Sequence, residues 1–461
     1  MIKNFTQELI RSWEDRKGNV NSMAAIEEWI ADANKQIKVN VEKIDFSYSG
    51  FWHYDESDGY IRNDNDSFFQ IAGYQEIEDD QIIEEQPIII QDEIGYLGII
   101  VRMIDGTLNF LMQAKIEPGN VNTVQLSPTL QATKSNFTRR HGGKQPQYLD
   151  YFVNSTRYGL VADQLESEQS SRFYKKRNRN VILLVEEDIP VAETHRWMTL
   201  GQIKELMKQD NLVNMDTRTV LSCLPFDISE IEDAALLAKV QSDPLLGSIL
   251  AKPDDKAIRA VFNVLNDHRM YRREKSRLLP VKSLKGWKMT KQEIVCRTPY
   301  DFKVIYCRIE IENREIRYWE QPMIESIGEA VFGLFAAMID GTWHYLVQIR
   351  HEMGCFDSAE LGPTVQISPK DTHRDMNDID LLFMKRWDKK QGVRQAVLLS
   401  EEGGRFYHEQ NHNVILEISP KEVGPLPTGY FWLDHATICA LISHNNCVNI
   451  QLRNLIAIID G

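Results

Sequence analysis

Residues 86–119 read QPIIIQDEIGYLGIIVRMIDGTLNFLMQAKIEPG, and residues 321–354 read QPMIESIGEAVFGLFAAMIDGTWHYLVQIRHEMG. The two stretches align without a gap, and both contain the string MIDGT. Agreement of this length within one chain indicates that the sequence carries two copies of one unit. This unit is far longer than the repeats of solenoid proteins, so the fold is predicted to consist of two similar halves.

The correspondence continues after these stretches. The string QLSPTLQ at 125–131 corresponds to ELGPTVQ at 360–366. The string RFYKKRNRNVILLV at 172–185 corresponds to RFYHEQNHNVILEI at 405–418. Three further residue pairs return to the register of the first stretches, namely Trp197 with Trp432, Asn214 with Asn449 and Arg218 with Arg453. The chain is therefore a tandem duplication.

Each copy is predicted to be an α+β unit. Two β-rich runs flank Asp105-Gly106, and the second copy repeats this pattern at Asp340-Gly341, which is a strong hairpin signal. The segments 199–211 and 434–446 have apolar residues at helical spacing. We therefore expect mixed, mostly antiparallel sheets with flanking helices.

The length of 461 residues favours more than one domain, because single cores seldom exceed roughly 250–300 residues. The predicted division is an N-terminal helical arm (1–45), a first repeat (46–225), a helical connector (226–280) and a second repeat (281–461). The arm and the connector carry apolar stripes, which favours packing or dimer contacts over a solvated linker.

The composition narrows the functional class. Hydrophobic residues make up 43% and charged residues 26%, ordinary values for a soluble globular protein, and the net charge is −14. This charge argues against nucleic acid or an anionic membrane as partner. The N-terminus has no apolar leader, no run is long enough to span a membrane, and the six cysteines lack C-x-x-C spacing. We therefore expect a cytoplasmic protein.

A polar stretch directly after the second hairpin strand is the first candidate site. Side chains alternate along a strand, so Gln113, Lys115 and Glu117 share one face. The alternative is an ion pair on a solvated sheet edge. The second copy keeps a similar face with Gln348, Arg350 and Glu352, which favours a site.

The following residues extend this candidate site. Gly119 and Asn120 belong to a turn, after which the amides and hydroxyls of one predicted strand face suit a sugar or a base: Gln125, Ser127, Thr129 and Gln131. Arg139, Arg140 and His141 then precede two glycines, and guanidinium groups suit a diphosphate. A polar sheet face in water and a solvated basic loop are the alternatives.

Other catalytic motifs are absent from the sequence. It has no G-x-G-x-x-G after a strand, no P-loop, no G-x-S-x-G and no H-E-x-x-H. The histidines lack metal-ligand spacing with carboxylates. We therefore expect a site without a nicotinamide cofactor or a metal.

The long string QAKIEPGNVNTVQLSPTLQAT at 113–133, together with QPIIIQDEIGYLGIIV, TRRHGG and YLDYF, resembles the NDP-hexose 2,3-dehydratase family of deoxysugar biosynthesis. The resemblance covers nearly the whole chain, including the duplication. It implies two Nudix-like domains, a homodimer, and a nucleotide-linked 4-keto-6-deoxyhexose, usually dTDP-linked, as substrate. The sequence has no Nudix box, so the resemblance implies a Nudix-like fold without metal-dependent hydrolysis.

The implied reaction removes the C2 hydroxyl and leaves a ketone at C3, and a downstream 3-ketoreductase would consume this product. The reaction is redox-neutral and requires a base, an acid and a donor to the enolate oxygen. We assign proton transfer to Glu117 or Tyr151, and we assign Lys115 to the enolate or to the leaving hydroxyl.

The remaining candidate residues are assigned to substrate binding. We expect Gln113, Gln125, Ser127 and Gln131 to orient the sugar, with Gly119, Asn120 and His141 nearby. Arg139, Arg140 and Arg172 would hold the diphosphate, and Trp52 or Tyr148 would lie near the base. The second copy has Arg350 in place of Lys115, so the first copy is predicted to hold the working site. A non-catalytic nucleotide-sugar binding protein and an atypical Nudix-type hydrolase are the alternatives.

Overall fold

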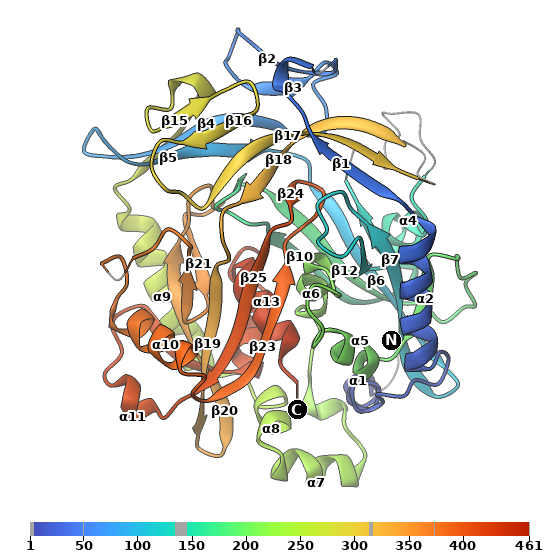
Figure 1. The fold of residues 1–461 in the computed structure, drawn as a ribbon. Helices are drawn as coiled ribbons and strands as arrows, with labels where there is room; N and C mark the ends of the chain where they lie inside the picture. Colours follow the sequence, from blue (N-terminus) through green and yellow to red (C-terminus); the bar gives the residue numbers. More distant parts are fainter. Residues whose placement is uncertain (1–3, 49, 134–144, 313–316, 373, 461) are drawn as a thin grey trace.

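The computed structural model describes residues 4–48, 50–133, 145–312, 317–372 and 374–460, and Figure 1 shows the arrangement of its elements. In the following, repeat 1 denotes residues 46–225 and repeat 2 denotes residues 281–461. Arg139, Arg140 and His141 lie outside the described residues.

The two predicted hairpins are confirmed. β6 (Gly95–Ile104) and β7 (Thr107–Ile116) pair around Asp105 and Gly106, and β19 (Val331–Ile339) and β20 (Thr342–His351) pair around Asp340 and Gly341. All four turn residues have positive φ, between 48° and 85°. Two consecutive positive φ angles define the turn whose twist matches that of paired strands, and Asp-Gly is a favoured sequence for it.

Each hairpin lies in the middle of a seven-stranded sheet, as counted over the described residues. The strand order is β10-β12-β6-β7-β13 in repeat 1 and β21-β20-β19-β25-β23 in repeat 2, with two further strands on each. The other strands of these sheets are β8 (Val124–Ser127), β9 (Leu130–Ala132), β10 (Gly159–Ser167), β12 (Arg177–Leu184), β13 (His195–Met198), β21 (Ala359–Gly362), β22 (Val365–Ile367), β23 (Val393–Ser400), β25 (Gln410–Glu417) and β26 (Tyr430–Asp434).

Two six-stranded sheets, again counted over the described part of the chain, lie at the top of Figure 1. In repeat 1 the order is β11-β5-β4-β3-β2, and in repeat 2 it is β15-β16-β17-β18-β24. Their strands are β2 (Trp52–Tyr54), β3 (Ile61–Asn63), β4 (Gln70–Glu78), β5 (Gln81–Ile90), β11 (Phe173–Tyr174), β15 (Trp287–Met289), β16 (Glu293–Cys296), β17 (Phe302–Ile311), β18 (Tyr318–Ser326) and β24 (Phe406–Tyr407).

The sixth strand of each of these sheets comes from outside its own repeat. β1 (Val39–Lys43), in the N-terminal arm, pairs with β17 of repeat 2, where Val39 is opposite Ile311. β14 (Lys275–Leu279), in the connector, pairs with β4 of repeat 1. The two halves of the chain therefore exchange strands and are interlocked through backbone hydrogen bonds.

Helices cover the seven-stranded sheets and fill the space between the repeats. Their bounds are α1 (Phe5–Glu14), α2 (Met23–Gln36), α4 (Leu149–Val153), α5 (Leu200–Leu206), α6 (Met215–Leu221), α7 (Ala234–Ser242), α8 (Pro244–Ile249), α9 (Asp255–Tyr271), α10 (Asp378–Asp388), α11 (Pro420–Val423), α12 (His435–Ile442) and α13 (Ile450–Ile458). Phe5, Leu9, Ile10 and Trp13 of α1 are buried in the largest core cluster.

Helices α6 and α13 pack against each other at the centre of the molecule (Figure 1). Asn214 and Asn449 cap their N-termini by accepting hydrogen bonds from Thr217 N and Leu452 N. Because each residue of the first turn of α6 is buried, its polar side chains face protein or cavity rather than solvent.

The mixed, mostly antiparallel α+β architecture with flanking helices is confirmed. The prediction that Gln125, Ser127, Thr129 and Gln131 share one face of a single strand is wrong. The chain forms two short strands here, since β8 pairs with β7 whereas β9 pairs with β6. Thr129 lies between them, where its Oγ1 donates to Leu111 O and accepts from Ile100 N at 2.9 Å.

Candidate active site

A cavity of about 870 Å³ lies where sheets of both repeats meet. Its wall includes Trp52, Lys115, Glu117 and Gln131 of repeat 1. Repeat 2 contributes residues from β18 and from the turn before β24: Tyr318, Trp319, Glu320, Gln321, Glu402, Gly404 and Arg405. The volume lies in the range of pockets that bind small organic ligands.

Lys115 and Glu117 form an ion pair in this cavity. The Lys115 Nζ to Glu117 Oε1 distance is 3.0 Å, and Gln131 Nε2 donates to the same oxygen at 2.9 Å. Glu117 Oε2 accepts from Gly403 N of repeat 2 at 3.2 Å. The Glu117 side chain is 7% exposed, so the pair is fixed in a largely dry wall.

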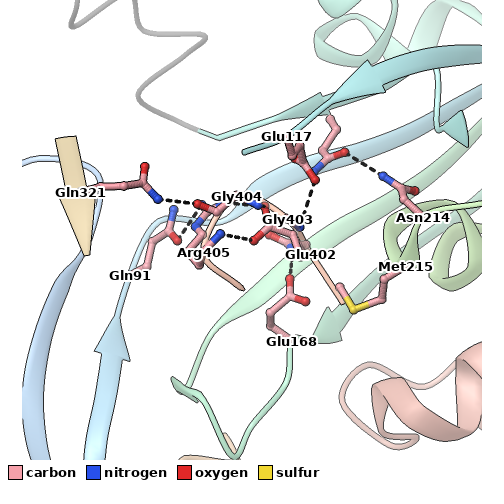
Figure 2. A network of polar contacts seen from close by, with 12 residues as sticks. Gln91, Glu117, Glu168, Asn214, Met215, Gln321, Glu402, Gly403, Gly404 and Arg405 are labelled. Atoms are coloured by element: carbon pink, nitrogen blue, oxygen red, sulfur yellow. Dashed lines mark hydrogen bonds and ion pairs between the residues drawn. The ribbon is translucent and has the colours of Figure 1, made fainter. Parts of the chain in front are cut away.

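The turn formed by residues 402–405 of repeat 2 contributes to the cavity wall, and Figure 2 shows its polar contacts. Gly119 N donates to Gly403 O at 2.7 Å, and His408 N donates to Gly119 O at 2.9 Å. Gly119 permits this approach, because a Cβ there would lie 1.6 Å from Phe406 O. Contact this close between the two repeats requires glycine at position 119.

An arginine from the same turn is held by buried partners. Arg405 Nη1 donates to Glu402 Oε1 at 2.8 Å, and Arg405 Nη2 donates to Gln91 Oε1 at 2.9 Å. Gly404 N also donates to Glu402 Oε1, at 3.0 Å. Burial, followed by the nearby charge of Glu117, raises the pKa of Glu402 despite the attraction of Arg405.

Two further buried titratable groups, Glu168 and Lys176, lie beside this turn. Asn178 Nδ2 donates to Glu168 Oε2, and Lys176 Nζ donates to Glu93 O. Burial together with the charge of Glu402 raises the pKa of Glu168 to about 7, and burial together with Arg405 lowers the pKa of Lys176 to about 8. Titration near neutral pH is typical of groups that transfer protons.

Four of the predicted site residues line this cavity, namely Trp52, Lys115, Glu117 and Gln131. Ser127 lies directly behind them, since its Oγ donates to Gln131 Oε1 at 3.1 Å. Lys115 and Glu117 line the same cavity. Gln113, from the same predicted strand face, is not among the described residues that line it.

Several other predicted residues make contacts outside the cavity lining. Gln125 Nε2 donates to Ser400 Oγ of repeat 2 at 2.6 Å, and Asn120 Nδ2 donates to Thr123 O at 2.9 Å. Tyr148 Oη donates to Pro190 O at 2.9 Å, and Tyr151 packs near Tyr148 and Tyr158. Among the described residues, the structure does not bring Tyr148 or Tyr151 to the cavity wall.

Arg172 is also placed away from this cavity, because the repeats exchange their turns. Arg405, its counterpart, lies over the ring of Phe68 at 4.7 Å, whereas Arg172 lies over the ring of Phe302 of repeat 2 at 4.3 Å. Lys175 N donates to Gly354 O at 2.7 Å, which mirrors the contact between His408 and Gly119. Each repeat thus supplies its arginine to the other one.

The corresponding place in repeat 2 keeps the glutamate–glutamine contact, but several of the other side chains differ. Gln366 Nε2 donates to Glu352 Oε1 at 2.7 Å, as Gln131 does to Glu117. The other positions differ: Arg350, Gln169, Gln451 and Glu409 stand where the first cavity has Lys115, Glu402, Asp216 and Lys176.

Glu168, Lys176, Asp216, Glu402 and Arg405 line the cavity and were not found from the sequence. A signal for three of them exists in the duplication. Residues of different charge align with Glu402, Asp216 and Lys176 in the other copy, whereas the surrounding apolar strings agree. Arg405 could be assigned to this cavity only once the exchange of turns between the repeats was known.

In the part of the chain that the structure describes, no group of three or more His, Cys, Asp or Glu side chains is arranged to hold a metal ion. Within the same ranges, no helix combines the length and apolar character needed to cross a membrane.

The family model for NDP-hexose 2,3-dehydratase matches residues 23–224 and residues 258–459. These two matches cover both halves of the chain. The chain belongs to the NDP-hexose 2,3-dehydratase family. The bounds of the matches include β1 and β14, so the exchanged strands are part of the repeating unit of this family.

Three relatives of this family are named dTDP-4-dehydro-6-deoxy-alpha-D-glucopyranose 2,3-dehydratase. The one from Saccharopolyspora spinosa is 37% identical over 93% of this chain and 89% of its own length. The one from Amycolatopsis orientalis is 35% identical over 94% and 89%, and the one from Streptomyces violaceoruber is 34% identical over 95% and 97%.

Replacement of Glu402 by Gln tests whether the turn of repeat 2 serves the cavity. We expect kcat to fall about 10-fold or more, because charge-assisted hydrogen bonds to Arg405 and Gly404 are weakened. Glu401→Gln is the matched control, since Glu401 is the preceding residue and instead accepts from Gln169 at 2.5 Å and Asn411 at 2.9 Å. Equal kcat values for the two variants, measured by product formation, would contradict a role of this turn.

Proposed function

We propose that the protein is a carbon–oxygen lyase that removes the C2 hydroxyl of an NDP-4-keto-6-deoxyhexose, with dTDP-4-keto-6-deoxyglucose as substrate. The product is an NDP-3,4-diketo-2,6-dideoxyhexose. The observation that carries this proposal is the buried ion pair of Lys115 and Glu117 in a cavity of ligand size, in a chain of this family. The names of the three relatives support the same reaction.

The chemistry assigns distinct roles to the two charges. The C4 ketone acidifies the C3 proton, and Glu117 removes it as the base. The negative charge that then develops on the substrate is stabilised by the ammonium group of Lys115, at the enolate oxygen or at the leaving hydroxyl. Both groups are held by protein contacts, so little reorganisation is needed during the reaction.

Substrate binding is proposed to use the rest of the cavity wall. Gln131 orients the sugar, and Trp52 offers an apolar surface. The assignment of Arg139, Arg140 and His141 to the diphosphate stays a prediction. It is supported by Thr133 and Pro146, which flank that segment and line the cavity.

Several further features stay proposals. These are the Nudix-like character of each repeat, the division at residues 45, 225 and 280, the homodimer, the downstream 3-ketoreductase and the cytoplasmic location. We also propose that the corresponding place in repeat 2 does not turn over substrate, since Lys115 and Asp216 are replaced there by Arg350 and Gln451. The non-catalytic binder and the Nudix-type hydrolase are not favoured, because the relatives are named as dehydratases.

Incubation with dTDP-4-keto-6-deoxyglucose in deuterium oxide tests the proposed function. A 3-ketoreductase is added to trap the product, and mass spectrometry identifies it. We expect a 2-deoxy sugar nucleotide that carries deuterium at C2, because the enol intermediate takes its C2 proton from exchangeable sites. Release of a sugar phosphate would support a hydrolase instead, and binding without any product would support a non-catalytic protein.

A further inference from the structure

Asp216 is a buried carboxyl group in the cavity wall that the roles above do not use. It lies in the first turn of α6 and is 2% exposed. Its Oδ1 has no hydrogen-bond partner within the described structure. An unpaired carboxyl oxygen at such a position is costly for stability, so its presence at a ligand cavity points to a functional group.

The surroundings of Asp216 place it at the Lys115–Glu117 end of the cavity. Asn214, the N-cap of the same helix, donates from Nδ2 to Gln131 Oε1 at 3.3 Å, and Gln131 donates to Glu117 Oε1 at 2.9 Å. Glu117 has Lys115 at 3.0 Å and Glu402 has Arg405 at 2.8 Å. Asp216 has no ion-pair partner in the described ranges, so no cation there holds its carboxyl group in the charged form.

The environment of Asp216 favours its neutral form over its charged form. Burial, followed by the charges of Glu168, Glu117 and Glu402, raises the pKa of Asp216 well above its usual range, and Lys115 acts in the opposite direction. A carboxyl group whose pKa is raised in this way is able to act as a general acid beside an ionised carboxylate that acts as a base.

We propose that Asp216 is the acid that protonates the departing C2 hydroxyl, while Glu117 takes the C3 proton and Lys115 stabilises the enolate oxygen. This inference rests on the proposed dehydratase function. It assigns the protonation of the departing hydroxyl, which the Lys115–Glu117 ion pair does not explain. The corresponding residue of repeat 2 is Gln451, which is buried like Asp216. An amide has no proton to give at neutral pH, which agrees with a working site in repeat 1 alone.

The protons balance over the cycle. Glu117 accepts the C3 proton as the electron pair forms the enolate, and the C2–O bond breaks as Asp216 transfers its proton, so that water leaves. The C2=C3 enol then takes a proton at C2 from Glu117. Its 3-hydroxyl proton returns to Asp216, which restores both groups and leaves the 3-ketone.

Asp216→Asn tests the assignment, because the amide has the size of the acid and lacks only the transferable proton. We expect product formation to fall about 100-fold or more. Exchange of the substrate C3 hydrogen with deuterium oxide, followed by NMR, should persist near the wild-type rate, since Glu117 and Lys115 are untouched. The thermal midpoint should not fall, because Asn resembles the neutral acid.

Glu166→Gln is the matched control. Glu166 is also fully buried with a pKa raised by burial to about 8, and it lies outside the cavity lining, beside Arg453. The same change there should leave exchange and product formation at wild-type rates.

Unchanged product formation in Asp216→Asn would overturn the proposal, and so would a parallel loss of exchange and product. If Asp216→Asn does not fold, Asp216→Ala is assayed with added formate. Restored product formation would support the acid role, and its failure with C3 exchange intact would refute it. Wild-type protein without C3 exchange or product would instead refute the dehydratase function itself, so the two failures are distinguishable.

Discussion

Glu117→Gln is expected to abolish both C3 hydrogen exchange and product formation. The variant keeps the size of the side chain and its contact with Gln131, but removes the group proposed to accept the C3 proton. It also leaves Lys115 without its partner at 3.0 Å. Loss of a positioned general base lowers rates by about 100- to 10,000-fold. Deuterium exchange at C3, followed by NMR, and kcat from trapped product measure the two effects separately.

The duplication supplies the control for this experiment. Glu352 holds the position of Glu117 in repeat 2 and accepts from Gln366 at 2.7 Å and from Asn449 at 3.3 Å. Glu352→Gln should therefore match Glu117→Gln in its effect on folding while leaving kcat unchanged. A larger loss of activity in Glu352→Gln than in Glu117→Gln would move the working site to repeat 2.

Gly119→Ala is expected to separate the turn of repeat 2 from the cavity. The added Cβ would lie 1.6 Å from Phe406 O and 2.8 Å from Gly403 O, and these are backbone atoms that cannot rotate away. Overpacking of this kind costs about 1–3 kcal/mol or more in the free energy of unfolding. The displaced turn carries Glu402 and Arg405, so kcat should fall together with stability. Chemical denaturation and product formation measure the two.

Gly247→Ala is the control for Gly119→Ala. Gly247 lies in α8, where an added Cβ would have its nearest neighbour, a methyl group of Thr342, at 3.1 Å. Alanine is favoured over glycine in helices by about 1 kcal/mol, which offsets that contact. Stability and kcat of Gly247→Ala should stay near those of the wild type, whereas a wild-type denaturation midpoint in Gly119→Ala would contradict the close approach.

The parts of the fold that depend on local sequence could be predicted. Asp105-Gly106 and Asp340-Gly341 predict their hairpins, because few other residue pairs accept two consecutive positive φ angles. Lys115 and Glu117 were predicted to lie together, because two residues of one strand separated by one position face the same side. Neither inference needed to know which parts of the chain meet in space.

The parts that depend on contacts between the copies could not be predicted. Nothing in the sequence of β1 says that it pairs with β17 rather than with the same strand of its own repeat. The exchange of turns likewise places Arg172 over the ring of Phe302 of repeat 2, and it brings Arg405, which was overlooked, to the cavity. The splitting of residues 125–131 into two strands was also missed. It depends on a tertiary contact, the hydrogen bond from Thr129 Oγ1 to Leu111 O, which the local sequence does not indicate.

The pairing of β1 with β17 also sets the order in which the chain can finish folding. On the ribosome, Val39 is made early, but its partner Ile311 emerges only after all of repeat 1 and the connector. Repeat 1, for its part, awaits β14 to complete its own sheet. Ordering so long an intervening chain is slow, because its entropy is lost before the contacts are gained. Repeat 1 can therefore complete its own sheet once the connector is synthesised, whereas β1 meets its partner strand only when repeat 2 follows.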